Sequence, residues 1–160
     1  MSLARSSERV SWSMFVAAHR AQPRRRLGAS TERVLVLVRD SEVRRWIEHE
    51  LFGERVSIDF VDAVPDILTS LTLVPPPWPH LLIIDIDAIA RAEVDQLATI
   101  REAGWPGMVI ALGDPAVTVQ RSLDIDIVVP RSLKCEQLRN AIKELRSNRA
   151  TLSVHHRRAG

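Results

Sequence analysis

The stretch that decides the fold is HLLIIDI, at residues 80–86. Its apolar residues follow one another instead of alternating with polar ones, as is typical of a strand buried on both faces of a parallel sheet. Asp85 interrupts the run near its end. We therefore predict that this stretch is the central strand of such a sheet, with a carboxylate at its carboxyl end.

Similar patterns on both sides of this stretch alternate between strand and helix. Apolar and β-branched runs predict strands, and apolar residues at helical spacing predict the segments between them. The expected strands are 33–38, 56–61, 80–86, 108–112 and 126–129, and the expected helices are 42–51, 64–73, 91–103, 115–123 and 133–145. This alternation predicts an α/β fold, a doubly wound five-stranded parallel sheet of flavodoxin-like order with helices on both faces.

Charge divides the 160-residue chain into three parts. Residues 1–33 have a net charge of +5, residues 34–143 of −6 and residues 144–160 of +3. We expect one domain at 32–147, preceded by a basic N-terminal arm or docking helix at 1–31 and followed by a basic C-terminal tail at 148–160. Basic segments of this kind bind nucleic acid, anionic membranes or acidic proteins, or remain solvated.

Several classes of function are disfavoured by what the sequence lacks. The single cysteine, Cys135, excludes an internal disulfide, and the five histidines do not predict a metal site because only His155 and His156 are neighbours. No apolar run approaches the roughly 20 residues that cross a membrane, so we expect a cytoplasmic protein without membrane insertion. The first strand lacks the glycine-rich turn of nucleotide-binding proteins, and no nucleophile motif is present, so we do not expect an enzyme.

Three stretches of the sequence carry a resemblance to a known family. Residues 34–45, with the sequence VLVLVRDSEVRR, resemble the opening strand, acidic turn and first helix of the receiver domains of two-component signalling. Residues 79–86, PHLLIIDI, resemble the third strand, and residues 131–138, RSLKCEQL, resemble the junction before the last helix. The resemblance extends over about 115 residues and implies that Asp85 stands at the phospho-acceptor position.

The same alignment implies that most of the phosphorylation chemistry is missing. The acidic pair that helps to hold Mg²⁺ falls on Val38 and Arg39, or in a register shifted by one on Arg39 and Asp40. The hydroxyl position falls on Gly113 and the lysine position on Arg131. We therefore expect no cofactor and a pocket lined by Val38, Arg39, Asp40, Asp87, Gly113 and Arg131.

Asp85 is expected to be a structural residue in that pocket. We hypothesise that Arg39 and Arg131 converge on it, because two guanidinium groups would hold its carboxylate ionised. Asp87 lies two positions after Asp85, and we do not expect the two carboxylates to form an acid–base pair.

Three functional hypotheses remain open on sequence alone. The first is a phosphorylation-independent pseudo-receiver that binds another signalling or regulatory protein, or a second copy of itself. The second is an atypical receiver, phosphorylated on Asp85, in which Asp40 or Asp87 helps to bind Mg²⁺. The third is a nucleic-acid-associated regulator that uses its arginine-rich ends. Candidate partner-binding residues for the first hypothesis are Trp12, Phe15, Val128, Leu138, Arg139 and Ile142.

Trp78 and Trp105, which adjoin prolines, either pack at strand ends or form a partner surface.

Overall fold

A computed structural model describes residues 32–72 and 78–158 of the chain. Five parallel strands form one sheet in the order β2-β1-β3-β4-β5, which confirms the predicted class and strand order. The strands are β1 (Glu32–Leu37), β2 (Val56–Val61), β3 (Leu81–Asp85), β4 (Met108–Leu112) and β5 (Ile127–Val129). Every residue of β3 is buried, as predicted for the central strand.

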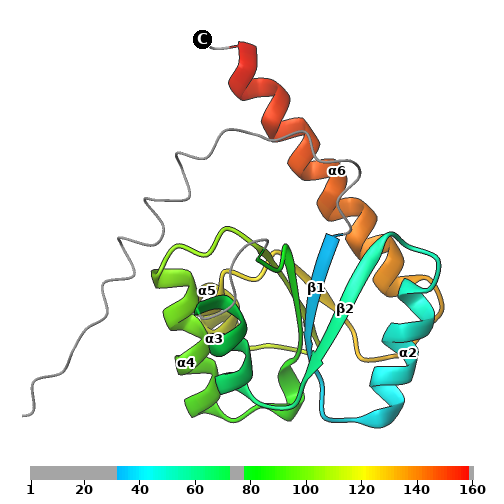
Figure 1. Cartoon of the computed structure of the whole chain (residues 1–160), viewed down its shortest axis with the longest axis vertical. Coiled ribbons are helices and arrows are strands. Elements are labelled where there is room, and N and C mark those ends of the chain that lie inside the picture. The colour runs from blue at the N-terminus through cyan, green and yellow to red at the C-terminus, as the bar shows by residue number, and fades with distance from the viewer. Residues whose placement is uncertain (1–31, 73–77, 159–160) are drawn as a thin grey trace, which may run out of the picture.

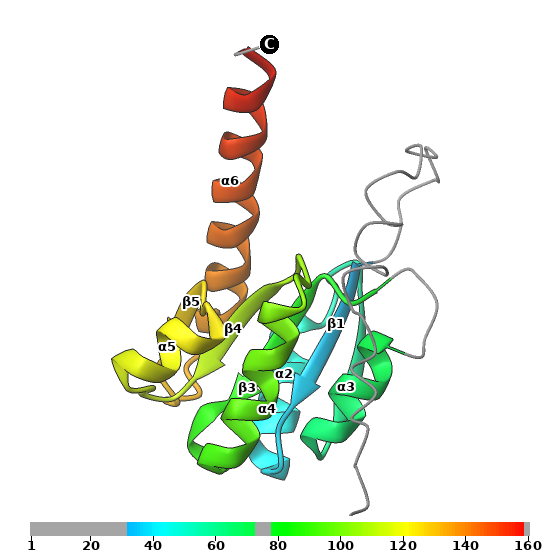
Figure 2. The same ribbon diagram turned by 90° about the vertical axis from the view of Figure 1, so that its left-hand side faces the viewer.

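Helices cover both faces of the sheet (Figures 1 and 2). They are α2 (Ser41–Leu51), α3 (Val64–Thr72), the 3₁₀ turn η1 (Ile86–Ala88), α4 (Arg91–Glu102), α5 (Val117–Leu123) and α6 (Gln137–Arg158). Alternate residues of β1 enter two separate cores. Val34 and Val36 pack in the core that contains residues of α2 and α6, whereas Leu35 and Leu37 pack in the core that contains residues of α3 and α4. Such two-sided burial explains the continuous apolar runs in the sequence.

The last helix differs most from its predicted range of 133–145. It begins at Gln137, because Leu133 and Glu136 have φ angles of +51° and +63° that an α-helix does not contain. It then continues to Arg158, through most of the segment predicted as a basic tail, since neither glycine nor proline interrupts residues 137–158. In both views its second half extends away from the sheet (Figures 1 and 2).

The tryptophans of the described residues have packing roles. Trp105 is buried and donates a hydrogen bond from Nε1 to the carbonyl oxygen of Pro79 over 3.2 Å. Trp78 packs against the same core, so strand-end packing is confirmed for both. Trp46 packs against the opposite core. Trp12 and Phe15 belong to the predicted N-terminal arm and lie outside the described residues.

Within residues 32–72 and 78–158, no helix has both the length and the hydrophobicity that a membrane span requires.

Replacing Gly107 with alanine should destabilise the fold, because the new Cβ would lie 1.9 Å from Cζ2 of the Trp105 ring. We expect Gly107→Ala to lower the free energy of unfolding by about 1–3 kcal/mol, the usual cost of overpacking a core, in urea unfolding at neutral pH. The control is Glu102→Ala at an exposed position of α4, which should change it by less than about 0.5 kcal/mol. Equal stability of Gly107→Ala and the unmodified protein would contradict the tight packing of this ring.

Candidate functional site

The candidate site lies where the central strands end. Asp85 is the last residue of β3 and is paired in register with Leu112, the last residue of β4. Arg131 follows β5, and Asp40 follows β1 in the segment that leads into α2. Since parallel strands end at the same edge of the sheet, residues far apart in the sequence meet here, as expected for this architecture.

Arg131 joins two of these carboxylates. Its Nη2 atom lies 2.8 Å from Oδ2 of Asp40 and 3.2 Å from Oδ2 of Asp85. Asp40 is also the N-cap of α2, where its Oδ1 accepts hydrogen bonds from the backbone amides of Glu42 and Val43 over 2.8 and 3.4 Å. One guanidinium nitrogen therefore lies between a buried strand-end carboxylate and a helix cap, and it connects the ends of β1, β3 and β5.

Arg39 does not take part in this arrangement. The hypothesis that Arg39 and Arg131 both converge on Asp85 is therefore wrong for Arg39. Its guanidinium donates to the carbonyl oxygens of Asp62 and Ala88, over 3.1 and 2.7 Å, and to the carboxylate of Glu93. These acceptors follow β2, belong to η1 and begin α4, and together they draw the side chain away from Arg131. Sequence alignment places a residue at a strand end, but it does not say which acceptors a long side chain will reach.

Val38 contributes no polar group to the pocket. It is buried in the core that also contains Val43 of α2. In the first of the two possible registers of the receiver resemblance, the acidic pair includes this position, which an apolar core side chain occupies here.

Asp87 and Gly113 face each other closely. Gly113 has a φ angle of +114°, which L-residues with a side chain rarely adopt, and a Cβ on it would lie 2.6 Å from Oδ2 of Asp87. The Asp87 carboxylate therefore lies where a side chain at position 113 would begin. Because β3 ends at Asp85 and Asp87 lies in η1, the two-residue periodicity of a strand does not set the relative direction of these two carboxylates.

Asp85 is in an unfavourable environment for a charge. Its side chain is 0% exposed, and neither carboxylate oxygen has a well-aligned hydrogen-bond partner among the described residues, although Arg131 is within ion-pair distance. Burial raises the pKa of Asp85, the nearby charge of Arg131 opposes this increase, and the charges of Asp87 and Asp40 add to it, while the backbone amide of Asp87 lowers the pKa slightly. Two amide hydrogen bonds from the start of α2 and the charge of Arg131 instead lower the pKa of Asp40.

Glu50 is a buried carboxylate that sequence reasoning missed. It is 1% exposed, and its oxygens accept hydrogen bonds from the backbone amides of Glu136 and Arg139, over 2.8 and 3.3 Å, at the start of α6. Its position relative to Val43 and Ile47 places it on the buried face of α2, and this helical spacing is the signal that would have found it.

The described part of the chain superposes on solved receiver domains. The signal receiver domain of an HD domain-containing protein from Pseudomonas fluorescens Pf-5 has 16% sequence identity and a TM-score of 0.60, over 79% of this chain and 98% of that one. A CheY-like response regulator receiver domain protein from Methanospirillum hungatei JF-1 has 13% identity and a TM-score of 0.62, over 76% and 98%.

The chain has the receiver fold. The pseudo-receiver domain of the CikA protein is also similar, with 17% identity and a TM-score of 0.53, over 69% of this chain and 92% of that one. No family model and no curated protein matches the sequence. At these identities the similarity concerns the receiver fold, and the chemistry has to be argued from the side chains.

The buried charge of Asp85 predicts a stability that decreases as pH rises. Because its pKa is raised on folding, ionised Asp85 opposes folding above the raised pKa, and this cost disappears as pH falls to the ordinary aspartate pKa. We expect Asp85→Asn to increase the free energy of unfolding at pH 7, and the gain to shrink near pH 4. Urea unfolding at both pH values measures it, and a loss of stability at pH 7 would show that the ion pair with Arg131 outweighs burial.

Asp40 predicts the opposite dependence. Its pKa is lowered on folding, so its contribution to stability is present above the ordinary aspartate pKa and is lost as pH falls through the lowered value. We expect Asp40→Ala to lower the melting temperature at pH 7, and the difference from the unmodified protein to narrow in acid. Asp40→Asn keeps an acceptor for the α2 amides and should therefore lower the melting temperature less than Asp40→Ala does. Equal melting temperatures for all three proteins at pH 7 would contradict the capping role.

Proposed function

We propose that this chain is a phosphorylation-independent, receiver-like regulatory module that acts through protein–protein interaction in signalling and is not an enzyme. The observation that carries the proposal is the position of Arg131, whose guanidinium lies between Asp40 and the fully buried Asp85. A cation is thus part of the fold at the place where receivers accept a phosphoryl group.

Magnesium fits this pocket poorly, and we propose that no cofactor is bound there. A dication bridging Asp40 and Asp85 would have to displace a guanidinium that is 2.8 and 3.2 Å from their oxygens. Mg²⁺ requires several oxygen ligands in octahedral geometry, and the side chain of Val38 offers none. The positive charge of Arg131 adds a repulsion that an intact acidic pair would not.

A phosphoryl group would also meet an unfavourable neighbour. In the receiver resemblance a hydroxyl at position 113 binds the phosphoryl oxygens, but here Asp87 lies over Gly113. A carboxylate at this position repels a phosphate, whereas a hydroxyl donates a hydrogen bond to it. Burial of Asp85 restricts the approach of a phosphodonor in addition.

We propose that the partner is another signalling protein or a second copy of this chain, and that it binds surfaces that do not depend on phosphorylation. Val128 on the edge strand β5 and Val117 on α5 are 36% and 59% exposed, which supports this side of the domain as a contact surface. Leu138 and Ile142 are buried in the core, so these two cannot form a partner surface. Arg139 is half-buried and donates a hydrogen bond to the Glu50 carbonyl, and it stays a partner-binding candidate. The proposal includes a cytoplasmic location without membrane insertion.

Titration with Mg²⁺ and beryllofluoride, a phosphoryl mimic, tests the proposal. Because the pocket already contains a guanidinium, we expect no saturable change in the amide chemical shifts of Asp85, Asp87 and Gly113 at millimolar ligand. A receiver domain with a complete acidic pocket is the positive control, and Asp85→Asn is the matched negative control. Saturable shifts in the unmodified protein that Asp85→Asn abolishes would overturn the proposal in favour of a phospho-accepting receiver.

A further inference from the structure

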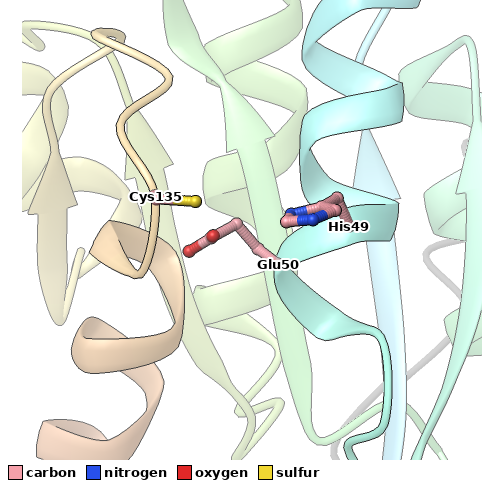
Figure 3. A group of neighbouring side chains, drawn as sticks. All are labelled: His49, Glu50 and Cys135. Atoms are coloured by element: carbon pink, nitrogen blue, oxygen red, sulfur yellow. The ribbon is translucent and has the colours of Figure 1, made fainter.

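Three potential metal ligands meet on the side of the domain where α2 ends and α6 begins. His49 and Glu50 belong to the last turn of α2, and Cys135 lies in the loop between β5 and α6. Among the described residues their ligand atoms form a group within 4.8 Å of one another. Figure 3 shows the His49 ring and the Cys135 sulfur directed toward each other, with the Glu50 side chain between them.

Glu50 is held in place before any metal binds. Its carboxylate is buried and accepts hydrogen bonds from the amides of Glu136 and Arg139. Each carboxylate oxygen has two lone pairs, so an oxygen that accepts one hydrogen bond can also ligate a metal ion. One ligand is therefore already fixed in position by the start of α6.

The loop that carries Cys135 is fixed to the same helix on both sides of this residue. The carbonyl oxygen of Lys134 accepts a hydrogen bond from Nε1 of Trp46 over 3.2 Å, and the amide of Glu136 donates to Glu50. Leu133 and Glu136 have positive φ angles, which turn the chain so that Cys135 lies over α2 and does not continue the helix.

We propose that His49, Glu50 and Cys135 form a Zn²⁺ site with water as the fourth ligand. A thiolate, an imidazole and a carboxylate form a mixed ligand set that suits zinc, whereas Mg²⁺ prefers oxygen alone. The two anionic ligands balance the charge of the dication, and the carboxyl end of α2 adds a favourable helix dipole. Ligand atoms in tetrahedral zinc sites are about 3.5 Å apart, which is less than the 4.8 Å limit of this group. The exposed side chains of His49 and Cys135 can rotate to bring their ligand atoms closer.

This site is separate from the Asp85 pocket and does not depend on the function proposed for the domain. His49 and Cys135 are 86 positions apart, so counting neighbouring histidines in the sequence could not find it. Bound zinc would fasten the start of α6 to the end of α2, which adds a metal-dependent constraint on the helix that extends from the domain.

Zinc binding to the full chain tests the proposal, with equilibrium dialysis for affinity and Co²⁺ substitution for the ligand set. We expect one equivalent of zinc and a thiolate-to-cobalt charge-transfer band in the near ultraviolet. Mutation of residues that only hydrogen-bond to zinc ligands lowers zinc affinity about 10–100-fold. Because Cys135 and His49 would bind the metal directly, Cys135→Ser and His49→Ala should each weaken zinc binding by about 100-fold or more. Cys135→Ser should also abolish the charge-transfer band.

Two controls separate this site from others on the chain. Glu48→Gln, at an exposed position of α2, and the double substitution His155→Ala/His156→Ala should both leave the affinity of this site and the cobalt band unchanged. Zinc binding that survives Cys135→Ser, or that is lost only with His155 and His156, would overturn the proposal. Failure of the unmodified protein to bind zinc below millimolar concentration would also overturn it.

Discussion

Burial of β3 on both faces is the constraint on which the rest of the structure depends. Its residues contribute to both cores, with Ile83 in one and Ile84 in the other, so helices must cover both sides of the sheet. The same burial extends to Asp85 at the end of the strand. A carboxylate at that position is removed from water whether or not it has a chemical task, and the protein has to accommodate its charge.

Arg131 compensates the buried charge of Asp85 only in part. Its guanidinium is shared between Asp85 and Asp40, and the shorter contact is to Asp40, which also caps α2. Asp85 is left with an ion pair but without a well-aligned hydrogen bond from the described residues, and burial therefore has the largest effect on its pKa. The pocket is thus a charge network within the fold, in which a helix cap, a loop arginine and a strand end depend on one another.

Sequence alone predicted the strands well because their signal is local. The range 108–112 was predicted to the residue, and β3 differs from 80–86 only at its ends. Among the site residues, the meeting of Asp85, Asp40 and Arg131 was predictable, since it follows from the order of parallel strands. The direction of Arg39 was not, because three distant acceptors decide it. Nor was the start of α6 at Gln137, which depends on Glu50 from another helix and on two residues with positive φ.

The length of α6 has a mechanical consequence. The helix has 22 residues and is therefore about 33 Å long, and the buried residues that anchor it, Leu138 to Leu145, lie in its first half. Thirteen residues follow Leu145, a length of about 20 Å, and a change of roughly 10° in the direction of this part would move its far end by about 3 Å. A small change in the packing of the first half of α6 would therefore produce a larger displacement of the end that lies farthest from the sheet.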